Sequence, residues 1–132
     1  MLRLEIVTPE RRVLDAEVES VTVPTASGEA GILTNHAPLV SALKPGIVSY
    51  TVKGSTAKLA ISGGFIEVNS DKVAVLVDTA ESADEIDAAA AKLAREEAEK
   101  ALAALSQSSS NDTEAARYTL DHANARLQIA GK

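Results

Sequence analysis

Short apolar segments separated by turn residues run through the first 80 residues, and they constrain the fold more than any other feature. In the first segment, Leu2, Leu4 and Ile6 alternate with Arg3 and Glu5, which is the period of a half-buried strand. Comparable apolar segments cover residues 13–14, 21–23, 28–33, 39–43, 47–52, 56–61, 65–68 and 72–77. Turn signals recur about every seven to twelve residues, a spacing typical of all-β sandwiches and barrels. We therefore predict an antiparallel β-sandwich for residues 1–80.

Glycine and proline define the expected turns of this sandwich. Pro24 is expected to end a strand. Gly28 and Gly31 are free to take positive φ angles, and Gly46 is expected to supply the positive-φ position of its turn. Residues 53–55 read Lys-Gly-Ser between two apolar segments, which predicts a β-hairpin.

The sequence changes character after residue 80, where alanine becomes dense and glycine is absent until Gly131. Residues 82–85 form a capping box, which predicts a helix running through residues 88–105. A serine-rich loop follows, and residues 111–114 form a second capping box. The helix that this box opens is expected to end at Gly131.

The predicted fold class is therefore α+β. An N-terminal antiparallel β-sandwich, residues 1–80, is followed by a C-terminal antiparallel two-helix hairpin, residues 81–132. The contact face of the hairpin is mostly alanine, with Ala116, Ala123 and Ala130 at helical spacing. Because alanine buries little apolar area, this face stabilises the hairpin weakly. We expect a mobile or partner-dependent appendage.

Composition excludes several classes of function. The chain has 132 residues, a formal net charge of -6 and only 2% aromatic residues, so we expect no nucleic-acid binding, which needs basic and stacking side chains. It contains no cysteine, which excludes disulfides and thiol nucleophiles. No apolar run approaches the roughly 18 residues of a membrane span, and the N-terminus does not resemble a secretory signal. Direct membrane insertion is therefore not expected, and any membrane role would require a partner.

Catalytic motifs are not evident in the sequence. His36 lies in the loop after residue 33 and is expected to hydrogen-bond to backbone, while His122 follows Asp121 on the second helix and is expected on a solvated face. Neither histidine has acidic or cysteine residues at the spacing that a metal site needs. Nucleophile-elbow and phosphate-loop motifs are also missing. We predict a protein that is no enzyme by itself and that uses no metal and no cofactor.

Three stretches together resemble the epsilon subunit of the bacterial and chloroplast F-type ATP synthase, which is equivalent to the mitochondrial delta subunit. They are GEAGILTNHAPL at residues 28–39, SGGFIEV at residues 62–68 and AESADEID at residues 80–87; EIVTP at residues 5–9 also fits. The resemblance covers the whole chain in order. It implies a non-catalytic central-stalk (rotor) subunit of a proton-translocating enzyme, located peripherally on the cytoplasmic face of the bacterial inner membrane.

The resemblance also implies partners. The sandwich of such subunits packs on the gamma subunit and rests on the c-subunit ring, and four residues of this chain correspond to the ring-facing loop: Glu29, Gly31, Asn35 and His36. The hairpin can lie folded on the sandwich or extend towards the catalytic alpha and beta subunits, and the extended form opposes ATP hydrolysis. If the extended hairpin meets acidic loops there, the available cations are Lys92, Arg95, Lys100, Arg117 and Arg126.

Some members of this family bind ATP on the folded hairpin through a motif Ile/Leu-Asp-x-x-Arg-Ala. The corresponding residues here begin with Ile86 and Asp87, and Glu81 and Arg126 are the other candidates for the site. Ala90 stands where the motif has arginine. Because each charge-assisted hydrogen bond lost with a guanidinium is worth roughly 1.5–3 kcal/mol, we predict weak or absent ATP binding.

Two other functions remain open at this point. One is a free-standing ligand-binding β-sandwich with the helices as a lid, although the chain lacks the aromatic lining and the convergent polar cluster of such sites. The other is a purely structural stalk adaptor, in which the hairpin is a fixed brace without regulation. The sequence does not separate this adaptor from a regulatory subunit.

Overall fold

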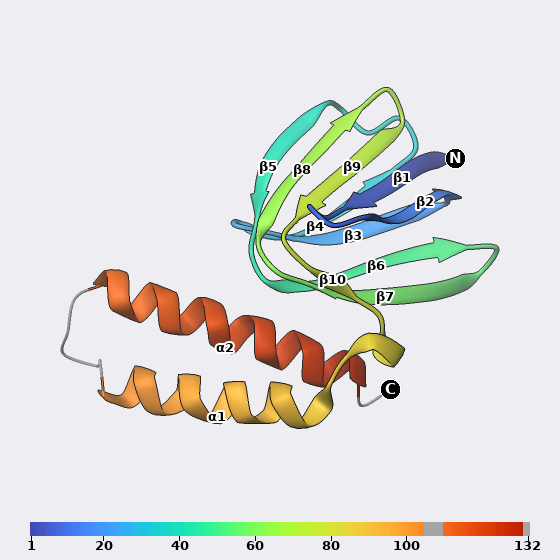
Figure 1. Ribbon diagram of the computed structural model, residues 1–132. Helices are drawn as coiled ribbons and strands as arrows, with labels where there is room; N and C mark the ends of the chain where they lie inside the picture. The colour runs from blue at the N-terminus through green and yellow to red at the C-terminus, as the bar shows by residue number, and fades with distance from the viewer. Residues whose placement is uncertain (105–109, 131–132) are drawn as a thin grey trace.

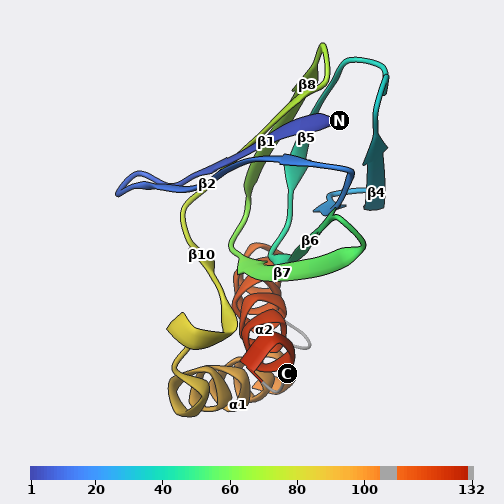
Figure 2. The same cartoon turned by 90° about the vertical axis from the view of Figure 1, so that its right-hand side faces the viewer.

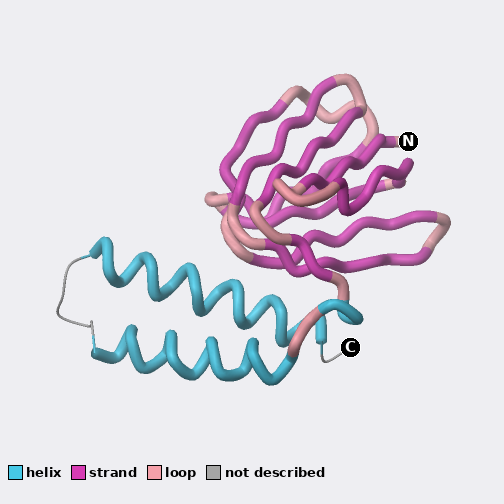
Figure 3. Tube along the Cα trace, viewed as in Figure 1, coloured by secondary structure: helices cyan, strands magenta, loops and turns pink. Residues whose placement is uncertain are grey.

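The computed structural model describes residues 1–104 and 110–130, and within the second range it describes side chains from residue 114 onward. Strands and helices occupy separate halves of the molecule, with the sandwich above and the hairpin below in Figures 1 and 3. The strands are β1 (Leu2–Val7), β2 (Arg12–Val18), β3 (Ser20–Thr25), β4 (Gly28–Leu33), β5 (Leu39–Leu43), β6 (Gly46–Val52), β7 (Ser55–Ile61), β8 (Gly64–Asn69), β9 (Lys72–Val77) and β10 (Ala80–Glu81).

The strands form a sheet in the order β10-β7-β6-β3-β5-β8-β9-β1-β2, and β4 pairs with β3 outside this path. The predicted antiparallel sandwich is confirmed except at one pair, because β1 runs parallel to β9. Strand β10, which pairs with β7, is not predicted by any sequence signal. Pro24 does not end its strand, since β3 continues to Thr25. The pairings that the sequence does not predict involve partners that are distant along the chain.

Alternate strand residues form an aliphatic core. Leu2, Leu4 and Ile6 are fully buried on β1, and the buried Val73 and Val75 of β9 lie beside Leu4 and Ile6 in register. The largest fully buried side chains of the described residues are all Leu, Ile or Val. Burial of a branched aliphatic side chain stabilises a fold by about 1.5–3 kcal/mol. Aliphatic burial alone can therefore stabilise the sandwich, without aromatic residues in its centre.

The hairpin predicted at residues 53–55 is present, and two glycines do not behave as expected. Lys53 and Gly54 both have positive φ, as do Ser70 and Asp71 between β8 and β9, which matches two-residue hairpin loops. Gly28 has a φ of 127°, but Gly31 and Gly46 do not use the left-handed region. Gly46 is needed for another reason, since a Cβ there would lie 2.9 Å from the Pro24 ring.

The helical part begins with a short 3-10 turn, η1 (Ala83–Glu85), followed by α1 (Ala88–Ala104) and α2 (Ser110–Ala130). The predicted capping box is present, because Glu85 Oε1 accepts the Ser82 N–H at 3.0 Å. However, it caps η1 and not α1, since Ile86 is extended and interrupts the helix. Asp87 caps α1 instead by accepting the Ala90 N–H at 3.0 Å.

The second capping box and the helix end at Gly131 lie outside the residues whose side chains or backbone are described. The helix that the box predicts is present and includes residue 110. α1 and α2 lie side by side, and α2 is the helix that faces β6 and β7 (Figures 1 and 2). We call the hairpin docked when it lies against these two strands, as it does in this structure.

The docked contact is small. Its buried residues are Ala60 on β7 and Ala125 and Ile129 on α2, and the half-buried Ile47 and Ile86 pack against them. The buried residues of α1 are Ala91 and Ala98, as expected for a face built from alanine. Ile86 explains why the first helix starts late, because its extended backbone lets its side chain pack into this contact.

Candidate functional site

The loop between β4 and β5 is fixed by hydrogen bonds at the end of the sandwich remote from the hairpin (Figure 2). Asn35 has a φ of 67°, and its N–H donates to Asp71 Oδ1 at 2.7 Å. His36 Nδ1 donates to the Ala37 carbonyl at 2.7 Å, because a carbonyl can only accept. This agrees with the expected backbone-bonded histidine.

The four residues predicted to face the ring are spread along β4 and the loop that follows it. Asn35 and His36 lie together in this loop, whereas Glu29 lies at the other end of β4, in a groove lined by Asn124 and Gln128 of α2. A strand rises about 3.3 Å per residue, so Glu29 and Asn35 are about 20 Å apart along the chain. Gly31 lies between them on β4.

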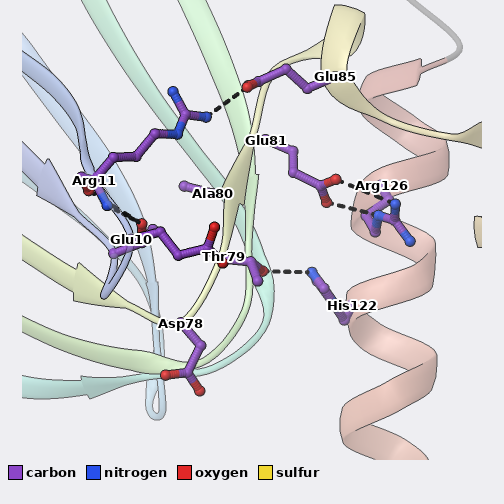
Figure 4. Close-up of a pocket in the computed structure, with 10 residues that line it drawn as sticks. Glu10, Arg11, Asp78, Thr79, Ala80, Glu81, Glu85, His122 and Arg126 are labelled. Carbon is purple, nitrogen blue, oxygen red and sulfur yellow. Dashed lines mark hydrogen bonds and ion pairs between the residues drawn. The ribbon is translucent and has the colours of Figure 1, made fainter.

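A cleft of about 480 Å³ opens where the hairpin leaves the sandwich (Figure 4). Its wall is formed by the β1–β2 turn, by the segment around β10, by η1 and by α2. The lining residues are Thr8, Glu10, Arg11, Asp78, Thr79, Ala80, Glu81, Glu85, His122 and Arg126. The cleft thus lies between the sandwich and the helical part, with residues of both in its wall.

Two ion pairs span this cleft. Arg126 of α2 meets Glu81 of β10, with Nη2 donating to Oε2 at 3.3 Å and Nε lying 2.8 Å from Oε1. The Nε–H bond is not aligned for a hydrogen bond. Arg11 Nη2 donates to Glu85 Oε2 at 2.6 Å, and this pair is more exposed. The Glu81–Arg126 pair, with side chains 24% and 20% exposed, is the one shielded enough to matter for docking.

His122 is half-buried in the cleft, so the expectation of a solvated face is wrong. Its Nε2 lies 3.4 Å from Thr79 Oγ1. Burial lowers the pKa of His122 below its ordinary value, the nearby charge of Arg126 lowers it further, and Glu81 opposes the shift. The neutral imidazole is therefore the form that the docked hairpin accepts.

We expect docking to weaken as the pH falls below about 6.5, the ordinary pKa of histidine. Undocked His122 binds a proton there, whereas the docked form resists it, so falling pH favours undocking; above this pH both forms are neutral. One proton limits the change to tenfold in the docking constant per pH unit.

Dyes on cysteines introduced at Lys58 and Glu99 of this cysteine-free chain would report docking, and we call this measurement the docking assay. His122→Gln should remove the response between pH 7.5 and 5.5; an unchanged response in this variant would contradict the prediction.

The structure brings only part of the predicted ATP site together. Glu81 and Arg126 meet, but as a pair that occupies the guanidinium. Ile86 packs against the docked contact, and Asp87 caps α1. Ala90 is exposed on the first turn of α1, and its short apolar side chain cannot supply the charge of the motif's arginine. Weak or absent ATP binding stays a prediction.

The five predicted cations do not lie on one surface of the docked hairpin. Lys92, Lys100 and Arg117 are exposed, whereas Arg95 and Arg126 are half-buried. Arg126 is turned towards the sandwich by its pair with Glu81. Sequence reasoning missed Arg11, Thr79 and Tyr118, although Tyr118, His122 and Arg126 follow the i, i+4, i+8 spacing of one helix face.

Comparisons with known proteins agree with this architecture. Residues 1–83 match the family described as ATP synthase, Delta/Epsilon chain, beta-sandwich domain, and residues 84–131 match its long alpha-helix domain. A curated ATP synthase epsilon chain of Desulfitobacterium hafniense is 45% identical over 127 residues, covering 96% of this chain and 94% of its own. Another, from Herpetosiphon aurantiacus, is 46% identical over 129 residues, covering 98% and 93%.

Solved structures show the same likeness. A chain in the Euglena gracilis mitochondrial ATP synthase, a structure of OSCP, F1 and c-ring, matches with a TM-score of 0.78 and 29% identity, covering 99% of this chain and 81% of that one. A chain in the Tetrahymena thermophila central stalk and c-ring shares the fold, with a TM-score of 0.59, 15% identity and coverage of 98% and 93%.

A β-sandwich followed by an alanine-rich two-helix hairpin is the domain order of the two family models that this chain matches. The chain belongs to the delta/epsilon family of the ATP synthase. These matches confirm three predictions: the family, its fold, and a non-catalytic subunit of that membrane-associated enzyme. In the described part of the chain, no helix is both long and apolar enough to cross a membrane.

Proposed function

We propose that this chain is a central-stalk subunit that couples the c-subunit ring to the catalytic head of a proton-translocating ATP synthase, and that its hairpin restrains ATP hydrolysis. Its place would be the cytoplasmic face of the bacterial inner membrane. The observation that carries the regulatory part is the small docked contact, built from Ala60, Ala125 and Ile129. Such a contact stabilises docking by only a few kcal/mol, which partner subunits can overcome.

The gamma subunit is proposed to cover an apolar surface on the outer face of β5, β8 and β9. Val40, Phe65 and Leu76 are 73%, 59% and 48% exposed, and Phe65 lies directly beside Leu76 in register. A groove lined by Val7, Phe65 and Leu76 continues this surface. Exposed apolar surfaces of this kind mark contacts between proteins.

The c-subunit ring is proposed to meet the loop that carries Asn35 and His36. This loop is pinned to the β8–β9 turn by the bond between Asn35 and Asp71, so its shape is set before any partner binds. Glu29 and Gly31 belong to the same proposed interface only if it extends along β4 towards the hairpin. The hairpin cations remain candidates for contacts with the alpha and beta subunits, after undocking in the case of Arg126.

The test is ATP hydrolysis by the assembled enzyme with three forms of this chain. A form ending at Ala83 keeps β10 but lacks the hairpin, and we expect it to hydrolyse ATP several-fold faster than the full chain. A second form, Ala60→Cys with Ala125→Cys, would lock the docked hairpin by a disulfide between two residues of the same buried cluster.

The locked form should hydrolyse as fast as the truncated form, and reduction of its disulfide should restore the restraint. The reduced double variant is thus the matched control for the cysteines themselves. Equal rates for all forms, with each bound to the enzyme, would instead support the stalk adaptor without regulation. Failure of every form to join the enzyme would contradict the proposed place in the stalk.

A further inference from the structure

Tyr118 of α2 reaches the sandwich at a point away from the apolar contact. Its Oη accepts the N–H of Gly63 at 2.7 Å, in the short link between β7 and β8. The apolar contact involves Ala125 and Ile129, which are 7 and 11 residues further along α2. At about 1.5 Å per residue, the two attachments are roughly 10–16 Å apart along the helix. Tyr118 is thus a further attachment point of α2, in addition to the apolar contact and the Glu81–Arg126 pair.

Gly63 is shaped to receive this tyrosine. A Cβ at Gly63 would lie 2.9 Å from Tyr118 Cε2 and 3.1 Å from its Oη. These distances are shorter than ordinary van der Waals contacts of a Cβ, so any larger residue would push the ring away. The adjacent Gly64 has a different reason to be glycine, since a Cβ there would collide with the backbone of β9. A Cβ at Gly63 would also lie 3.1 Å from the Leu43 carbonyl oxygen, so Gly63 leaves room for both the tyrosine and the end of β5, whereas Gly64 leaves room for β9 alone.

The neighbouring backbone holds Gly63 in position. The Ser62 N–H donates to the Thr79 carbonyl at 3.1 Å, and the Thr79 N–H donates to Ser62 Oγ at 2.8 Å. These bonds tie the β7–β8 link to the segment that leads into β10. The Gly63 N–H is left to point at α2. If α2 contacted the sandwich at one point it could pivot there, whereas contacts at separated points along α2 fix its direction.

We propose that the Gly63–Tyr118 contact is a latch that keeps the hairpin docked on the sandwich. Its regulatory consequence rests on the function proposed above, because releasing the latch would favour the extended, inhibitory hairpin. The latch itself is a property of the single chain. It gives the β7–β8 link a role in regulation in addition to its role in the sheet.

Tyr118→Phe tests the latch with little risk to folding, since it keeps the ring and removes only the hydroxyl. A lost hydrogen bond of ordinary strength corresponds to an about three- to tenfold lower docking constant, which the docking assay measures. The Gly63 amide should also exchange its hydrogen faster. Thr119→Val is the matched control, because the Thr119 hydroxyl bonds to Ala115 within α2 and should leave docking unchanged.

Gly63→Ala provides the complementary change. It should weaken docking while Tyr118 is present and should have little further effect on docking in a Tyr118→Ala background, where no ring collides with the new methyl group. Unchanged docking and unchanged Gly63 exchange in Tyr118→Phe would overturn the latch. Weaker docking without slower hydrolysis by the assembled enzyme would support the latch and contradict the regulatory function.

Discussion

Gly64→Ala should destabilise the sandwich by about 3 kcal/mol or more, among the largest effects expected of a single methyl group. The added Cβ would collide with the carbonyl oxygen of Leu76 and lie 2.8 Å from the Val77 Cα. Both are backbone atoms of β9, and Gly64 sits in a strand that is paired on both sides. Relief would therefore require two strand pairs to shift. Urea unfolding followed by circular dichroism would measure the change.

Gly31→Ala is the matched control for this substitution. Gly31 also lies in a strand, but a Cβ added there would have no atom within 4 Å, and its φ is not in the left-handed region. Alanine there should be neutral or should stabilise the fold by up to about 1 kcal/mol, because glycine loses more conformational entropy on folding. If both variants lay within about 1 kcal/mol of the unmodified chain, the steric account of Gly64 would be wrong.

Glu81→Leu should undock the hairpin, with an expected loss of about 2 kcal/mol, or roughly thirtyfold in the docking constant. Breaking a fully buried ion pair costs about 3–5 kcal/mol because a charge is left unpaired, and we lower this figure because the pair with Arg126 is about one-fifth exposed. Arg126 would then face the sandwich without its carboxylate. The docking assay measures the loss directly.

The double variant Glu81→Leu with Arg126→Leu distinguishes an ion-pair effect from a simple loss of packing. Removal of both charges leaves no unpaired group, so the double variant should dock better than Glu81→Leu alone. Docking that is as weak in the double variant as in the single one would show that the electrostatic account is wrong.

The sequence predicts the sandwich strands well because their signals are local. Alternation at Leu2, Leu4 and Ile6 and the turn at Lys53-Gly54 each specify a few neighbouring residues. The parallel pairing of β1 with β9 could not be predicted in this way. It depends on which strands meet after the chain has folded.

The hairpin shows the limit of the same reasoning. The capping box at Ser82 is present, but tertiary packing of Ile86 delays α1 until Ala88. The environment of His122 differs from the expected solvated face for a similar reason, since the helix face that docks depends on the sandwich surface. The spacing of Tyr118, His122 and Arg126 is the available signal, and it indicates a shared face without naming what that face contacts.

The extended backbone at Ile86, between η1 and α1, is a short link about which the hairpin can rotate as one body. β10 holds the chain to the sheet just before this point, and α1 then extends for 17 residues, about 25 Å at 1.5 Å per residue. A rotation of about 10° at this link would displace the far end of α1 by roughly 4 Å. A small rotation at Ile86 thus becomes a displacement of the far end of α1 that a distant subunit can detect.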